Sequence, residues 1–160
     1  YPVFRYRQRD AFFRGLDLDT RYYVLPERLF LRAKGSMIWA NERKTGRYFP
    51  YIPALRLSEE VGTRIPELLG GSAELSIGHQ FVDRQRRFDP ATDLTDSPAG
   101  YHLFGLEASY TRPLGGRQSL RLTLSADNLL NTQYKEYTNR ARYYSHDVGR
   151  DIRFSLHYKF

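Results

Sequence analysis

The last ten residues of the chain place the strongest constraint on its fold. From Asp151 to Phe160 they read D-I-R-F-S-L-H-Y-K-F, so apolar or aromatic side chains alternate strictly with polar ones. Successive side chains of a β-strand point to opposite faces, and this segment therefore predicts a strand with one apolar and one polar face. Such a strand separates either a protein core from water or membrane lipid from a wet barrel lumen. This segment alone is compatible with both environments.

The same alternation recurs along the chain, and no segment shows a helical period. It predicts about eight strands, in the segments 1–9, 11–24, 29–40, 54–65, 72–82, 101–112, 118–127 and 151–160. The pattern is weakest in 54–65, because Glu59 falls on the same face as Leu55 and Leu57. A carboxylate on an apolar face indicates either a position near the rim of the sheet or a bulge that shifts the register.

The connections between these segments alternate in length. Short connections at 25–28, 66–71 and 113–117 alternate with long ones at 41–53, 83–100 and 128–149. Short turns on one rim and long loops on the other are typical of up-and-down membrane barrels, whereas a soluble lipocalin-type barrel is expected to be less asymmetric. The sequence therefore predicts an all-β fold, an antiparallel up-and-down transmembrane β-barrel of the bacterial outer membrane. An aromatic residue at a strand end, Trp39, suits a membrane interface but also a core position.

The amino-acid composition excludes several other classes of protein and of binding site. The 160 residues contain no cysteine, which excludes disulfides and cysteine-ligated metals. No apolar run approaches the roughly 18–20 residues of a membrane helix, while alternating barrel strands average to a polar composition. The net charge of +7 is spread along many segments without a basic block, so nucleic acid is not an expected partner. The chain opens without a secretory signal, and we expect a mature form or a fragment of a longer protein.

Four stretches carry a family resemblance. They are F-F-R-G-L-D-L-D from Phe12 to Asp19, I-P-A-L-R-L from Ile52 to Leu57, A-D-N-L-L-N-T-Q-Y from Ala126 to Tyr134, and G-R-D-I-R-F-S-L-H-Y-K-F from Gly149 to Phe160. In this order they resemble the C-terminal third of TonB-dependent outer-membrane receptors. The first stretch departs from the family pattern, because aspartates stand where glutamates are usual.

The resemblance implies that residues 1–160 form the C-terminal part of a barrel of roughly 22 strands, with the plug domain outside this chain. It implies active uptake of a scarce nutrient: siderophore-bound iron, haem, cobalamin, a metal or an oligosaccharide. The implied partners are outer-membrane lipid and lipopolysaccharide, the barrel-assembly machinery, and the TonB complex through the missing plug region. No cofactor is implied.

Two groups of residues match family features near the end of the chain. The alternating side chains of the last strand resemble the C-terminal signal read by the barrel-assembly machinery: Phe154, Leu156, Tyr158 and Phe160. Asp127, Asn128 and Asn131 resemble the polar turn that precedes the last extracellular loop. We expect their physical role to be local, as capping groups and Asx-turns.

The loop 131–149 holds the candidate ligand-binding residues, which are aromatic or basic: Tyr134, Tyr137, Arg140, Arg142, Tyr143, Tyr144 and His146. Arginine and aromatic rings together can bind an anionic, partly flat ligand such as a metal–siderophore complex, through charge and stacking. The favoured alternative is a solvated surface loop with interfacial tyrosines and arginines that face lipopolysaccharide.

Enzymatic and metal chemistry are not expected. The four histidines, His79, His102, His146 and His157, lie on different segments without metal-ligand spacing. Asp17 and Asp19 stand beside Arg21, which indicates ion pairing rather than a catalytic dyad. Two further classes stay open: a complete small eight-stranded barrel with a structural or adhesion role, and a soluble β-sheet enzyme or lipid-binding protein.

Overall fold

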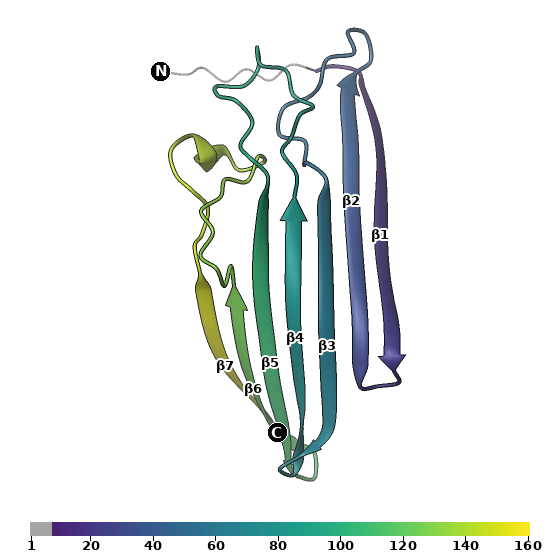
Figure 1. Cartoon of the computed structure of the whole chain (residues 1–160), viewed down its shortest axis with the longest axis vertical. Helices are drawn as coiled ribbons and strands as arrows, with labels where there is room; N and C mark the ends of the chain where they lie inside the picture. Colours follow the sequence, from purple (N-terminus) through teal and green to yellow (C-terminus); the bar gives the residue numbers. More distant parts are fainter. Residues whose placement is uncertain (1–7) are drawn as a thin grey trace.

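The computed structural model describes residues 8–160, which form one antiparallel sheet of seven strands in chain order (Figure 1). The strands are β1 (Ala11–Leu25), β2 (Leu29–Glu42), β3 (Arg56–Leu68), β4 (Gly71–Val82), β5 (Tyr101–Gly115), β6 (Gln118–Asp127) and β7 (Asp151–Lys159). A single-turn helix, η1 (Arg140–Tyr143), interrupts the last loop. The predicted all-β, antiparallel, up-and-down arrangement is confirmed, and the strand expected at 1–9 falls almost wholly outside the described residues.

The sheet is open. Each strand pairs only with its neighbours in sequence, so β1 and β7 lie at opposite edges (Figure 1). In the part of the chain that the structure describes, the strands are therefore not closed into a barrel. No helix among residues 8–160 has the length and apolar character needed to cross a membrane.

Cross-strand register gathers most of the apolar side chains of the seven strands on one face, which we call the apolar face. Partners such as Val61 and Ile77, or Leu124 and Phe154, lie directly opposite each other on it. These side chains are largely open, with Ile77 54% and Phe154 69% exposed. The buried apolar cluster is small and lies at the loop end, where Ala54, Val82 and Tyr101 pack together.

The opposite face, the polar face, carries charged side chains that pair across strands. On it Arg32 donates to Asp19 at 2.7 Å, and Arg64 lies 3.5 Å from Glu74. Ion pairing of Asp19 was expected, but its partner is Arg32 on β2 rather than Arg21 on its own strand. Arg32 stands diagonally across from Asp19, within reach of a long side chain, and Lys34, directly opposite Asp19, lies 3.8 Å from the same carboxylate.

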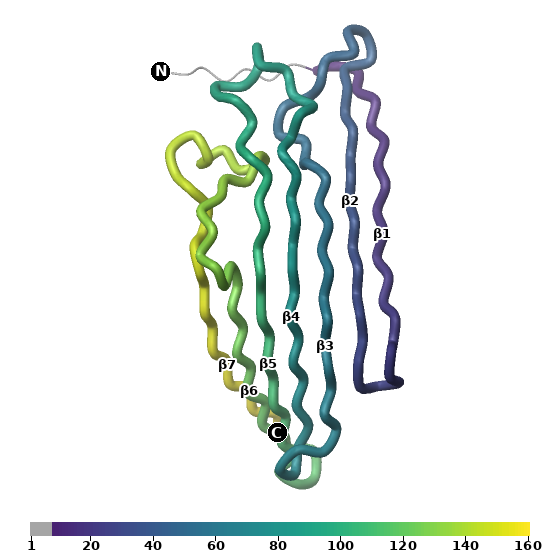
Figure 2. The backbone as a smooth tube through the Cα atoms, viewed as in Figure 1, coloured from purple at the N-terminus to yellow at the C-terminus, as the bar shows by residue number. Residues whose placement is uncertain are grey.

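Short turns lie at one end of the sheet and long loops at the other (Figure 2). The hairpins are tighter than expected: β3 runs through Pro66, and β5 runs through Pro113, which pairs with Ser119. Gly115 and Gly116 then reverse the chain at φ +110° and +59°. Glycine tolerates such values, so the strands can extend into the predicted turn before it closes.

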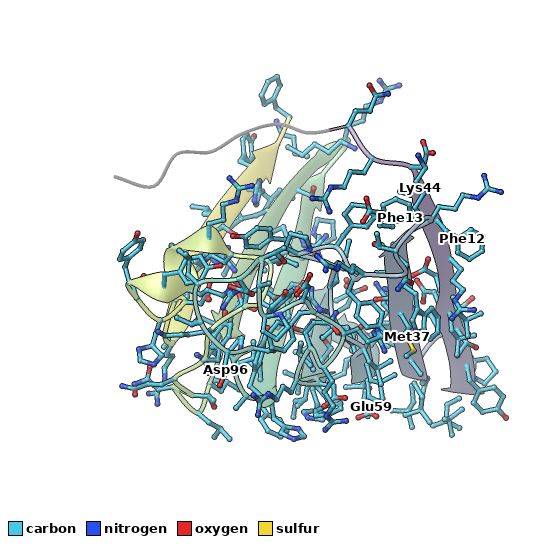
Figure 3. The ribbon with its side chains drawn as sticks, turned by 90° about the horizontal axis from the view of Figure 1, so that it is seen from above. Phe12, Phe13, Met37, Lys44, Glu59 and Asp96 are labelled. Atoms are coloured by element: carbon cyan, nitrogen blue, oxygen red, sulfur yellow. The ribbon has the colours of Figure 1, made fainter. Side chains whose placement is uncertain are left out.

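Alternation is directly visible on β1. Seen from above, Phe12 and Phe13 point to opposite sides of that strand (Figure 3). The ring of Phe13 stacks on Phe49 of the first long loop, with 6.2 Å between centroids. The polar-face side of β1 is thereby joined to the loop end of the molecule.

One close contact on the polar face requires glycine. The ring of Phe30 on β2 lies over Gly62 on β3, and a Cβ at residue 62 would stand 2.2 Å from Phe30 Cζ. The guanidinium of Arg21 lies 4.4 Å from the centroid of the same ring. Only a residue without a side chain fits beneath this ring, because heavy atoms do not approach so closely.

Candidate functional site

A buried ion pair joins the second and third of the three long loops, which span residues 43–55, 83–100 and 128–150. Arg142 donates from Nη2 to both carboxylate oxygens of Asp93, at 2.7 and 2.6 Å, and from Nε to the carbonyl of Tyr137 at 3.1 Å. The side chains of Arg142 and Asp93 are 2% and 1% exposed. This pair therefore ties the second long loop to the third inside the protein.

Hydrogen bonds bring the first long loop into the same cluster. The Tyr143 hydroxyl donates to Asp93 Oδ1 at 2.6 Å, and it lies 3.0 Å from the hydroxyl of Tyr51. Gln85 donates from Nε2 to the carbonyls of Ile52 and Pro53, at 2.7 and 3.0 Å. The loops therefore form one connected unit, which we call the loop cluster.

A second network anchors the loop cluster to the sheet. Glu136 Oε2 accepts from Arg56 Nη2 and from the Tyr101 hydroxyl, both at 2.6 Å. Arg56 begins β3 and Tyr101 begins β5, so one loop carboxylate spans two strands. The ring of Tyr134 packs on Tyr101 with 4.4 Å between centroids.

The structure divides the seven candidate ligand-binding residues into two groups. Arg142, Tyr137, Tyr143 and Tyr134 lie within the loop packing, and Tyr137 and Arg142 are each 3% exposed. Tyr144, Arg140 and His146 lie on the exposed surface of the loop cluster, with the guanidinium of Arg140 5.0 Å from the ring centroid of Tyr51. The second group can meet a ligand directly, whereas the first shapes the surface that carries it.

Of the asparagines in the turn after β6, Asn128 acts locally, as expected, whereas the side chain of Asn131 accepts from the amide of Arg150 at the far end of the loop, at 3.0 Å. Asn128 and Asn131 adopt φ of 49° and 54°, a conformation that asparagine tolerates better than most residues. The side chain of Asn128 accepts from the amide of Thr132 at 2.8 Å and donates to its carbonyl at 2.9 Å. These bonds fix the start of the last loop.

The polar face bounds an open hollow of about 1440 Å³. Its wall reaches from Asp17 on β1 to Arg153 on β7 and includes Tyr134 and Val148 of the last loop. Charges of both signs line it, and several are paired across strands. Such a surface suits water or a large polar partner rather than an apolar small molecule.

The stability of the loop cluster depends on pH through the carboxyl group of Asp93 and the phenol groups of Tyr143 and Tyr137. Burial raises the pKa of Asp93, but hydrogen bonds from Tyr143 and Arg142 outweigh burial, and the pKa is lowered overall. Burial and the bond to Asp93 raise the pKa of Tyr143, and burial raises that of Tyr137 to about 12. A carboxyl group whose pKa is lowered stabilises the fold at pH values above its ordinary pKa. A phenol whose pKa is raised stabilises the fold at pH values below its ordinary pKa.

We therefore expect the loop cluster to stay ordered between about pH 4 and pH 10 and to loosen beyond both limits. A spin label on Thr92→Cys or Lys135→Cys of the natural protein would report this as low mobility across that window. A label on Arg28→Cys in a short turn is the control and should show no such limits. Loosening near pH 6 to 7, the ordinary range of histidine, would contradict the assignment to Asp93 and Tyr143.

Comparison with protein-family models, with curated protein sequences and with solved structures found no match to this chain. Within residues 8–160, no three or more His, Cys, Asp or Glu side chains are grouped to hold a metal ion. Function must therefore be inferred from the motifs and from the geometry of the sheet and its loops.

Proposed function

We propose that this chain is the C-terminal part of the transmembrane β-barrel of a TonB-dependent outer-membrane transporter, which takes up a scarce nutrient. The exposed apolar face carries this proposal. It extends over all seven strands, with Leu16 70% and Leu156 58% exposed near its two edges. Soluble monomers rarely expose contiguous apolar patches larger than a few hundred Å², so a face of this extent requires a cover, and membrane lipid supplies one.

Strand length supports the same function. The shortest strand, β7, has 9 residues and the longest, β1 and β5, have 15. A tilted membrane-crossing strand needs roughly 9–11 residues. Every described strand is therefore long enough to cross the hydrocarbon layer.

The two open edges favour part of a large barrel over a complete small one. Backbone N–H and C=O groups at a strand edge have no water to bond in lipid, and each unsatisfied group is unfavourable by several kcal/mol. The edges of β1 and β7 lie at opposite sides of the sheet. Further strands of a parent polypeptide would pair with both edges, whereas the alternative small eight-stranded barrel would have to bring them together.

The remaining features find roles within this proposal. The polar hollow would face the lumen and the plug domain, and the loop cluster would lie outside the cell. In this proposal Tyr144, Arg140 and His146 would meet an incoming nutrient. The aromatic side chains of β7 lie on the exposed apolar face, where an assembly factor could contact them.

The test is to purify the natural polypeptide carrying these residues in detergent from washed outer membranes and to measure its intact mass. The proposal expects a species several times the 18.8 kDa of this chain. Deleting its gene should abolish energy-dependent uptake of one member of a panel of siderophores, haem, cobalamin, metals and oligosaccharides. A membrane species near 18.8 kDa would indicate the small barrel, and absence from the membrane would overturn both.

A further inference from the structure

Three titratable side chains meet on the apolar face. Glu59 on β3 lies directly opposite His79 on β4, and His102 on β5 lies diagonally beyond His79. Nδ1 of His79 is 3.0 Å from Glu59 Oε2, and Nε2 of His79 is 2.9 Å from Nδ1 of His102. The three residues form one hydrogen-bonded chain across three strands, which we call the Glu59–His79–His102 chain.

The sequence contained an indication of the Glu59–His79–His102 chain, although the histidines stand on separate segments. Each of the three residues occupies an apolar-face position in three consecutive strands. The register continues unbroken through Glu59, so the bulge considered for this strand is absent at that position and the rim placement holds. Glu59 and His79 are each the fourth residue counted from the loop end of their strands, and His102 is the second residue of β5.

The geometry of the two imidazoles is that of a straight hydrogen bond. Their planes differ by 9°, and their centroids are 5.2 Å apart while the facing nitrogens are 2.9 Å apart. The centroid separation equals the N···N distance plus the distance from each centroid to its own ring nitrogen. Both nitrogens therefore lie nearly on the line between the two centroids, and the rings are almost coplanar. One proton lies between them, and near-linear bonds of this length are the favourable ones.

The proton positions in the Glu59–His79–His102 chain follow from the carboxylate of Glu59. Ionised Glu59 can only accept, so Nδ1 of His79 carries a hydrogen. With His79 neutral, its Nε2 accepts from Nδ1–H of His102, and Nε2 of His102 keeps a lone pair. A proton added at Nε2 of His102 lets the Nδ1 proton pass to Nε2 of His79. His79 is then an imidazolium beside Glu59, and His102 presents an N–H donor.

Among the described residues of strands β2 to β5, few other titratable side chains share the face of the Glu59–His79–His102 chain. On the same face of β2 to β5, the other titratable side chains are Tyr110 and Arg112, which lie toward the short-turn end. Ala33 of β2 lies opposite Glu59, and the rings of Phe104 and Phe81 pack at 4.7 and 4.8 Å from the rings of His79 and His102. His102 is exposed at the outer end of the chain.

We propose that the Glu59–His79–His102 chain is a proton-operated site for a phosphate-bearing lipid headgroup on the lipid-facing side of the barrel. This site rests on the proposed function, because headgroups lie at the level of the loop-end rim only if the apolar face is in lipid. Histidine is the side chain that ordinarily changes charge between about pH 5 and 8. Uptake of one proton offers a phosphate oxygen an N–H donor in place of a lone pair, so binding strengthens as the pH falls.

The first test reads the proton positions in the natural protein, reconstituted in nanodiscs with ¹⁵N-labelled histidine. Two-bond ¹⁵N–¹H spectra distinguish the Nδ1–H from the Nε2–H form. At about pH 8 both His79 and His102 should carry hydrogen on Nδ1, and toward about pH 5 one proton should enter and His102 should change to Nε2–H. An Nε2–H form of His102 throughout the titration would overturn the proposal.

The second test measures phosphatidylglycerol retained by the natural protein in native mass spectrometry at about pH 5 and about pH 8. We expect several-fold more retention at the lower pH, and loss of that gain in His102→Phe but not in Tyr110→Phe, a control on the same face. Equal retention at both pH values would overturn the site. Inorganic phosphate that alters the His102 signals as strongly as the lipid would also overturn it, since free phosphate would then be the ligand.

The two proposals fail in distinguishable ways. If the natural polypeptide is absent from the outer membrane, the transporter function fails before any lipid is tested. If it is an outer-membrane transporter whose lipid retention does not depend on pH, only the headgroup site fails.

Discussion

Replacing Arg142 with methionine is expected to loosen the contact between the second and third long loops while the sheet stays intact. The Asp93 carboxylate would remain buried without its cation, and removing one partner of a buried ion pair typically destabilises by about 3–5 kcal/mol. Hydrogen exchange of the natural protein should become much faster in residues 83–100 and 128–150 and stay slow in the strands. The matched control is Arg86→Met, because Arg86 is 74% exposed in its pair with Asp83 and such pairs contribute little.

A double variant separates the lost cation from lost packing. In Arg142→Met/Asp93→Leu no unpaired carboxylate remains, so the loops should recover part of their protection relative to the single variant. If hydrogen exchange in the Arg142→Met variant keeps the wild-type rate, or if loops and strands lose protection equally, the role given to this ion pair is contradicted.

The second large effect is expected at Gly62. In Gly62→Ala the new Cβ would stand 2.2 Å from Phe30 Cζ and 2.4 Å from Cε1, so the ring or the strand must move. Overpacking of this kind typically destabilises by about 1–3 kcal/mol. The loss should appear as a lower midpoint for heat-induced unfolding of the natural protein, followed by circular dichroism.

Another glycine on the same face supplies the control. A Cβ at Gly78 would meet only the Glu59 carbonyl, at 3.8 Å, so Gly78→Ala should leave the midpoint nearly unchanged. Removing the ring in Phe30→Leu should make the added Gly62→Ala change much less harmful. An equal loss in the Gly62 and Gly78 variants would show that backbone freedom, rather than the ring of Phe30, explains the glycine.

The local pattern predicted the strands and their faces because alternation is a property of neighbouring residues. Strand order followed as well, since short turns join antiparallel neighbours. In Leu120 to Ala126 each apolar residue lies on the apolar face, as the sequence pattern predicts. Turn bounds were less accurate at Pro113, because a proline is compatible with the end of a hairpin strand as well as with a turn.

The contacts within the candidate site could not be predicted in the same way. Arg142 and Asp93 are 49 residues apart, and no periodicity says which of many charged loop residues will pair. The same holds for Glu136 with Arg56 and Tyr101, whose contacts depend on how the last loop folds over the rim. The contacts of Glu59, His79 and His102 needed the register of three strands, which the sequence indicates only through polar residues at apolar-face positions.

The central claim, that the apolar face lies in lipid, is tested most directly by spin labels along β6. This chain has no cysteine, so single cysteines from residue 119 to residue 125 can be labelled in the natural protein once any cysteine elsewhere is replaced. In lipid bilayers, labels at 120, 122 and 124 should collide most with oxygen, and labels at 119, 121, 123 and 125 most with a water-soluble nickel complex. Equal access of the nickel complex to both sets would contradict the account.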